Sequence, residues 1–167
     1  VNMSLYVEYV YVSQAEREYL KSNKLCYACQ TFQRTEFRIP YTLTEFVCDT
    51  QFVNMVKEIF WVIQEDQSTS NLYNYSNDLV TLRLLLDGDE VISDDFGTPQ
   101  FLTWITKHTR ASKRNYYGYS FELDPESLQE NGSVNMTAVT RQRHILTLVP
   151  STQWRSLRVY AHAYNIC

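Results

Sequence analysis

The sequence contains few of the residues that interrupt regular structure, with only four glycines and four prolines among 167 residues. This scarcity excludes a collagen-like or low-complexity chain. No apolar run approaches the ~20 residues that a helix needs to cross a bilayer, and no stretch has the pattern of a signal peptide. The net charge is −4 and the basic residues are scattered. Nucleic-acid binding is therefore not expected, because affinity for the phosphate backbone requires clustered lysines and arginines.

The sequence motifs of common enzymes are also absent. There is no G-x-S-x-G, H-E-x-x-H or phosphate-binding glycine loop. His108, His144 and His162 stand alone in the sequence, and we expect them to have surface or packing roles. A hydrolase that used His144 or His162 would need a carboxylate and a nucleophile within hydrogen-bonding distance. We therefore predict that the protein is not an enzyme and has no catalytic residue.

The cysteines do not predict a metal site. Cys26 and Cys29 have the C-x-x-C spacing of zinc and redox sites. In a strand, however, residues three apart point to opposite faces, and Cys48 and Cys167 are single. We expect buried thiols, with a disulfide or a metal site as alternatives. The acidic residues from Asp87 to Asp95 lack the spacing of an EF-hand loop and predict a solvated turn. No cofactor or metal is expected.

Aromatic residues are abundant and include 13 tyrosines. Between residues 116 and 123 they alternate with small or polar residues, a period of two that predicts a strand. Its predicted apolar face consists of Tyr117, Tyr119, Phe121 and Leu123. Pro125 ends this strand, because proline has no N–H to give to a neighbouring strand.

Other segments predict short strands joined by turns. Residues 3–12 carry bulky side chains on both faces, so we expect this strand to be covered on both sides. Ser13 and Glu16 form a capping box that predicts a helix from Gln14 to about Lys21. Residues 42–64 could begin with a second capping box, but we favour strands with a turn near residues 54–57. Further predicted strands are 25–39, 80–86, 145–149 and 157–164. In the second of these, Val80, Leu82, Leu84 and Leu86 share one apolar face, and Asp87-Gly88 forms a tight turn after it. Residues 101–107 are predicted as a short helix or a covered loop.

Short strands at this spacing predict an all-β sandwich or barrel. At 167 residues, with 44% hydrophobic residues, the chain is long enough to form a single core.

Four segments carry a family resemblance. They are Ser4-Leu-Tyr-Val-Glu-Tyr-Val-Tyr-Val12 with the following Glu16-Arg17, Val56-Lys-Glu-Ile-Phe-Trp-Val-Ile-Gln64, Tyr117-Gly-Tyr-Ser-Phe-Glu-Leu-Asp-Pro125 with Gly132-Ser-Val-Asn-Met-Thr137, and Val159-Tyr-Ala-His-Ala-Tyr-Asn165. In this order they resemble segments of the major capsid proteins of the nucleocytoplasmic large DNA viruses. The R-[IV]-D that often follows the third segment in that family is replaced here by Ala138-Val-Thr140, which leaves a divergent minor capsid protein as an alternative.

The resemblance implies an all-β jelly-roll sandwich with short helices in its loops, the second jelly roll of a double jelly-roll capsid protein. Residues 1–12 would be the last strand of a preceding jelly roll, 13–24 a connector and 25–167 the C-terminal jelly roll, in a piece of a longer polypeptide. The implied function is structural. Three copies would form a capsomer of pseudo-hexagonal outline that tiles an icosahedral shell.

The resemblance also implies the partners and the location. The partners would be two further copies in a homotrimer, neighbouring capsomers and minor capsid proteins, with no direct contact with nucleic acid and only indirect contact with an inner membrane. The protein would be located in the virion after assembly in the host cytoplasm. We expect the loops at residues 64–78 and 87–114 to make contacts between subunits or on the outer surface.

Two further possibilities concern sugars. Sequons occur at Asn2, Asn74, Asn131 and Asn135, and Asn74 and Asn131 lie in predicted loops that could accept a glycan. Because the family assembles outside the secretory pathway, N-glycosylation is a weak expectation. A lectin-like or receptor-binding sandwich, with Trp104 and Trp154 stacked on sugars, is the alternative from another functional class.

Overall fold

The computed structural model describes residues 5–23, 26–66, 75–93, 107–109, 114–127 and 129–166. Within these residues the chain forms one helix and nine strands. The elements are α1 (Gln14–Ser22), β1 (Ala28–Ile39), β2 (Glu45–Thr50), β3 (Met55–Glu65), β4 (Leu79–Leu86), β5 (Asp89–Ile92), β6 (Tyr116–Ser120), β7 (Val134–Asn135), β8 (Gln142–Leu148) and β9 (Arg155–Ile166). None of the described residues belongs to a helix that is long and apolar enough to cross a membrane.

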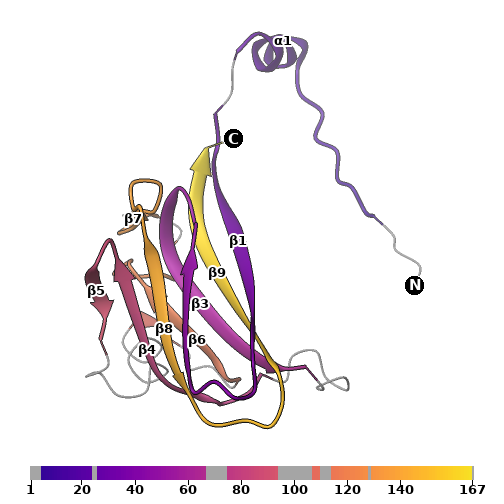
Figure 1. The fold of residues 1–167 in the computed structure, drawn as a ribbon. Coiled ribbons are helices and arrows are strands. Elements are labelled where there is room, and N and C mark those ends of the chain that lie inside the picture. The colour runs from indigo at the N-terminus through magenta and orange to yellow at the C-terminus, as the bar shows by residue number, and fades with distance from the viewer. Residues whose placement is uncertain are drawn as a thin grey trace.

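The strands form two antiparallel sheets that face each other (Figure 1). One sheet has the order β1-β9-β3-β6, with the short β7 also paired to β3, and the other has the order β2-β8-β4-β5. The pairing is nested, because β1 pairs with β9, β2 with β8, β3 with β6, and β4 with β5. A long hairpin rolled into two facing sheets has this pairing, which is that of the jelly roll. The predicted jelly-roll sandwich is therefore confirmed.

The core lies between the two sheets and follows from the alternation of side chains along each strand. In β9 the inward positions include the small residues Ala161 and Ala163, and in β3 the inward positions carry large side chains. Register places Ala161 opposite Ile59 and Val159 opposite Trp61, so small and large side chains meet across the strands. Leucines from β4 and β8 close the core from the other sheet.

Two predicted apolar faces are wrong in detail. Val80 is 44% exposed, whereas Leu79 is buried together with Leu82 and Leu84. The cause is a register shift between Leu79 and Thr81 in the pairing with β8, which reverses the alternation at that point. In the aromatic strand, β6 ends at Ser120 and Leu123 is 81% exposed, so the predicted face does not extend to residue 123.

The strands predicted within residues 42–64 and the Asp87-Gly88 turn are confirmed, but the solvated turn expected for Asp87 to Asp95 is wrong in part, because Asp89 and Glu90 pair with β4 as the start of β5. Residues 45–50 and 55–65 form strands and not a helix, and the chain turns at Asn54, whose φ is 67°. The turn predicted near residues 54–57 is shorter than expected, because residues 55–57 already belong to β3. Asp87 and Gly88 form the tight turn between β4 and β5, with φ values of 52° and 98°. Residues 101–107, predicted as a short helix or a covered loop, lie outside the described residues except for Lys107.

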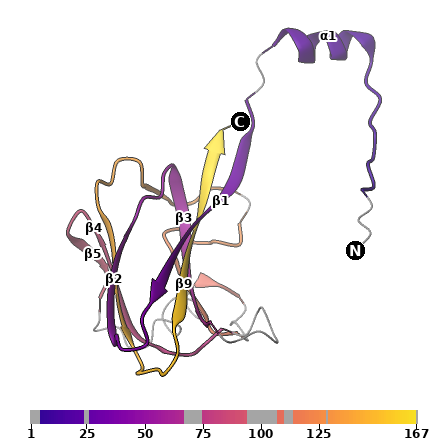
Figure 2. The ribbon, with the colours of Figure 1, turned by 45° about the vertical axis from the view of Figure 1, so that its right-hand side comes forward.

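The N-terminal part of the chain lies apart from the sandwich in both ribbon views (Figures 1 and 2). Helix α1 begins after Ser13, whose Oγ accepts a hydrogen bond from Glu16 N at 3.3 Å, as the capping box predicts. Residues 5–12 are extended and belong to no sheet, and residues 5–11 are exposed; Leu5, for example, is 89% exposed. The expected cover on both sides is thus not found within the described part of the chain. The assignment of residues 1–12 to a preceding domain stays a prediction.

Candidate interaction surface

The outer face of sheet β1-β9-β3-β6 carries an open aromatic cavity. In the register of this sheet, Phe60 of β3 lies between Tyr160 of β9 and Gly118 of β6. Because Gly118 has no side chain, β6 places no side chain opposite Phe60 on this face. The cavity has a volume of about 330 Å³ and is lined by Phe32, Phe60, Val62, Tyr75, Arg114, Tyr116 and Tyr160.

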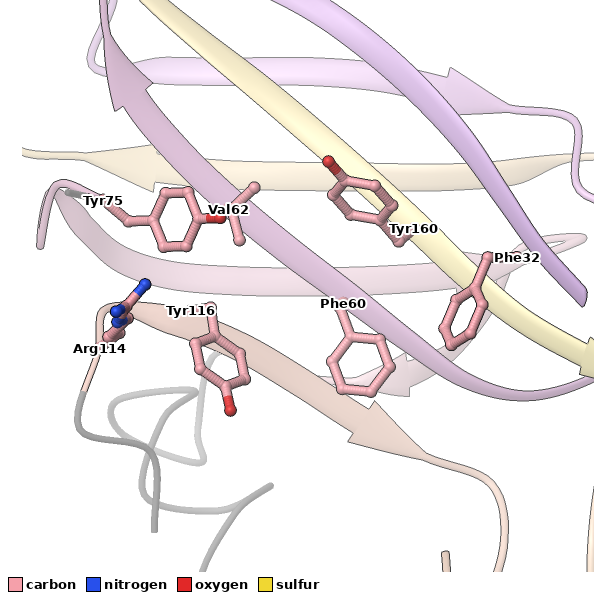
Figure 3. Close-up of a pocket in the computed structure, with 7 residues that line it drawn as sticks. All are labelled: Phe32, Phe60, Val62, Tyr75, Arg114, Tyr116 and Tyr160. Atoms are coloured by element: carbon pink, nitrogen blue, oxygen red, sulfur yellow. The ribbon is translucent and has the colours of Figure 1, made fainter. Parts of the chain in front are cut away.

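The lining residues belong to the neighbouring strands β1, β9, β3 and β6 and to the segments that precede β4 and β6, and Figure 3 shows their side chains. Phe32 of β1 is 66% exposed at one side of the cavity. Apolar surface of this kind on the outside of a sandwich is typical of contact surfaces. The cavity was not predicted, since it depends on the register between strands that lie far apart in the sequence.

A buried ion pair lies next to this face. The ammonium of Lys57 is 3.1 Å from Glu122 Oε2, and both side chains are almost fully buried. The hydroxyl of Tyr164 donates to Glu122 Oε1 at 2.6 Å. Lys57 is at the register shift between Val56 and Glu58 in the pairing of β3 with β9. Burial and the hydrogen bond to Glu122 raise the pKa of Tyr164.

Glu58 lies between two histidines from distant parts of the chain. Its Oε1 is 3.0 Å from His108 Nε2 and its Oε2 is 3.2 Å from His162 Nδ1. Burial raises the pKa of Glu58 to about 7, despite the opposing charge of Lys57. Burial also lowers the pKa values of both imidazoles. Near neutral pH the carboxyl group and the two imidazoles therefore compete for protons.

Two of the histidines can be compared with the requirements of a hydrolase. His162 has a carboxylate partner, but its other recorded contact within the described residues is the ring of Phe32, stacked at 4.2 Å, and not a hydroxyl nucleophile. His144 is fully buried and has a hydroxyl partner in Thr50, at 2.9 Å from Nε2.

The tautomer of His144 follows from its other partner. The indole N–H of Trp61 can only donate, and it points at His144 Nδ1 at 3.1 Å. The proton of the neutral imidazole must then be on Nε2, which donates to Thr50, so His144 cannot remove a proton from that hydroxyl. Burial lowers the pKa of His144 to about 4. The expected packing role of His144 is consistent with this network.

The cysteines are only partly as expected. No disulfide joins Cys26, Cys29 and Cys48. Cys48 is buried, and burial raises the pKa of its thiol to about 12. Cys26 is exposed and Cys29 is half-buried, so the expectation of buried thiols is wrong for this pair. Cys26 precedes β1 and Cys29 is the second residue of β1, at the open end of an edge strand. Cys167 lies outside the described residues.

The two long loops return to the sandwich side by side. Asn115 Nδ2 donates to Tyr75 O at 3.0 Å, and Tyr117 OH donates to Asn77 Oδ1 at 3.1 Å. The C-terminal ends of the predicted contact loops, 64–78 and 87–114, are therefore adjacent. Trp154 lies near them, because its carbonyl accepts from Asp66 N at 3.0 Å. The guanidinium of Arg38 covers one face of the Trp154 ring at 4.8 Å, which leaves less of the ring surface for stacking on a sugar. Trp104 lies outside the described residues.

Of the two predicted glycan acceptors, Asn131 and Asn74, only Asn131 lies among the described residues. The amide of Asn131 holds the loop after β6, since Nδ2 donates to Asp124 O at 2.9 Å and Oδ1 accepts from Asp124 N at 3.1 Å. Asn74 lies outside the described residues. Glycan attachment at either residue stays a prediction.

No protein-family model and no curated protein matches the chain. Solved structures of viral proteins do share its fold. VP54 of PBCV-1, in the crystal structure fitted into a cryo-EM reconstruction of the virophage Sputnik, matches with a TM-score of 0.72 and 14% identity over 93% of this chain. A chain of the quasi-atomic model of the PBCV-1 virus capsid matches with a TM-score of 0.67 and 13% identity over 90%. The Faustovirus major capsid protein matches with a TM-score of 0.70 and 12% identity over 93%.

At these identities the likeness shows the fold, which is the jelly roll of the capsid proteins of large DNA viruses. The chain spans 52% and 51% of the two PBCV-1 chains and 36% of the Faustovirus chain.

Proposed function

We propose that this chain is the C-terminal part of a structural capsid protein of a large DNA virus. The observation that carries the proposal is the nested strand order, which matches three viral capsid chains over at least 90% of this chain. A capsid role requires faces and edges that bury surface against neighbours, and no reaction centre. The aromatic cavity on the outer face of sheet β1-β9-β3-β6 supplies such a face.

The proposal includes two jelly rolls in the longer protein. Residues 1–12 would be the last strand of the first, 13–24 the connector and 25–167 the second. A short sequence repeat supports this division, because Ser4-Leu-Tyr-Val7 and Ser156-Leu-Arg-Val159 share the pattern S-L-x-V. The second copy of the pattern begins at the start of β9, the last strand of the described jelly roll, where Leu157 and Val159 are fully buried.

The finer part of the proposal is a homotrimeric capsomer that packs against other capsomers and minor capsid proteins in an icosahedral virion. With two similar sandwiches in each chain, three chains present six similar units, which fits pseudo-hexagonal packing. In this arrangement the outer face of sheet β1-β9-β3-β6 packs against a neighbouring sandwich. The exposed Phe32 and the aromatic cavity beside it would then be covered.

The test is the mass of the full-length polypeptide that contains this chain, measured by light scattering. We expect a stable trimer. The variant Phe32→Ser should lower the melting temperature of the trimer, because it removes a side chain from the proposed contact face. The control Leu123→Ser removes another highly exposed apolar side chain from a loop outside this face and should have a smaller effect. A stable monomer at micromolar concentration would contradict the proposed capsomer.

A further inference from the structure

A second cavity lies on the opposite sheet, β2-β8-β4-β5, beside the tight turn between β4 and β5. Its volume is about 250 Å³. It is lined by Leu85, Asp87, Gly88, Thr140, Arg141 and Arg143. In the sheet register Arg143 of β8 lies between Asp49 of β2 and Leu85 of β4. The two arginines therefore lie at the rim of one cavity, at the start of a central strand.

One carboxylate orients both guanidinium groups. Arg141 Nε is 3.1 Å from Asp49 Oδ2, and Arg143 Nε is 3.1 Å from Asp49 Oδ1. Each arginine uses its Nε for this contact, and no hydrogen bond recorded among the described residues uses their terminal Nη groups. Two positive charges thus share one negative partner. The terminal N–H groups of two forks held side by side are donors for a further anion.

The other acidic groups nearby are occupied elsewhere. Both carboxylate oxygens of Asp87 accept from the backbone, Oδ1 from Arg141 N at 2.7 Å and Oδ2 from Thr140 N at 3.1 Å. This contact fastens the β4–β5 turn to the start of β8 and fixes the floor of the cavity. Glu90 is paired with Arg83 at 2.6 Å. Among the described residues, neither carboxylate accepts a hydrogen bond from the terminal N–H groups of the arginine pair.

We propose that this cavity binds a tetrahedral oxyanion, a phosphate or sulfate group, between Arg141 and Arg143. A tetrahedral anion has enough terminal oxygens to accept from both forks at once, whereas a carboxylate has two. The site is held open before the anion arrives, because Asp49 fixes the guanidinium groups and Asp87 fixes the turn. Inorganic phosphate, inorganic sulfate and a sulfate ester on a sugar share the required chemistry.

The test is a titration of the whole chain with sodium sulfate, sodium phosphate and a sulfated disaccharide, each against sodium chloride at equal ionic strength. Binding is followed by the NMR shifts of the arginine side-chain nitrogens. We expect saturable shifts of Arg141 and Arg143 with the oxyanions and none with chloride. In Arg143→Gln the affinity should fall by at least about tenfold, since a charge-assisted hydrogen-bond pair is lost.

The matched control is Arg38→Gln, which removes an exposed arginine paired with Asp66 on the other sheet. This variant should bind the anions as the parent does. Tighter binding of the disaccharide than of inorganic sulfate would identify a sulfated sugar as the ligand, and tighter binding of phosphate would identify the free anion. Shifts that do not saturate, or that weaken equally in Arg38→Gln and Arg143→Gln, would overturn the proposal.

Discussion

Acidification should destabilise this protein through one buried imidazole, that of His144. In the folded state Trp61 donates to its Nδ1, so a second proton on the ring would leave the indole N–H facing another donor. The pKa of His144 is lowered from 6.5 to about 4. A lowered pKa means that the unfolded chain binds this proton more readily, so stability is lost as the pH falls from 6.5 through 4. Between pH 7.5 and pH 5 the loss amounts to about 2 kcal/mol of unfolding free energy.

The experiment compares the native chain with His144→Gln by urea unfolding at a series of pH values. The glutamine amide has an oxygen that can accept from Trp61 and an NH₂ group that can donate to Thr50, but it does not titrate. Other titrating groups, including Glu58 and His162, are the same in both proteins, so their effects cancel in the difference. The native chain should lose about 2 kcal/mol relative to the variant between pH 7.5 and pH 5. A difference between the two proteins that does not change with pH would refute the network.

Two further substitutions test the loop after β6 and the buried ion pair. Gly132 has a φ of 152°, and a Cβ there would lie 2.8 Å from Phe121 O, so Gly132→Ala should cost about 1–3 kcal/mol in urea unfolding. Gly88→Ala, which meets no atom within 4 Å but also has a positive φ, should cost less, and an equal cost would contradict a steric cause. Lys57→Met should cost about 3–5 kcal/mol at pH 7, because it leaves the Glu122 carboxylate buried without its cation. The double variant Lys57→Met with Glu122→Gln should recover most of this loss, and no recovery would contradict the unpaired Glu122 charge as its cause.

The strands that the sequence predicts well are those in which local alternation also decides burial. In β9, small or apolar residues such as Ala161 alternate with longer side chains such as Tyr160 and His162, and the structure buries the first set. The start of α1 is equally local, because Ser13 and Glu16 are three residues apart. Pairing across the sheets is not local. The register shift at Leu79 that exposes Val80 depends on β8, more than 60 residues away, and no pattern in residues 80–86 indicates it.

The same limit applies to the sites. His108, Glu58 and His162 come together from three separate parts of the chain, and nothing in the spacing of these residues indicates that Glu58 lies between two imidazoles. The sequence does contain one indication of the buried ion pair between Lys57 and Glu122. Lys57 and Glu58 are adjacent charges inside the otherwise apolar run 56–63, a position in which charges must find partners. The nature of the partner, Glu122, required the fold.

The N-terminal segment gives an independent physical argument for a larger assembly. Six large apolar or aromatic side chains are more than half exposed there: Leu5, Tyr6, Val7, Tyr9, Val10 and Tyr11. Burying a large apolar side chain contributes roughly 1.5–3 kcal/mol, so covering all six would contribute on the order of 10 kcal/mol, which is comparable to the whole stability of a typical domain. Both faces of the segment carry bulky groups, so one flat surface would cover only half of them. A strand inside a sandwich buries one face against the opposite sheet, as β9 does here, and its outer face is covered only where a neighbour packs on it. The proposed preceding jelly roll, packed within a capsomer, would supply both covers for residues 1–12.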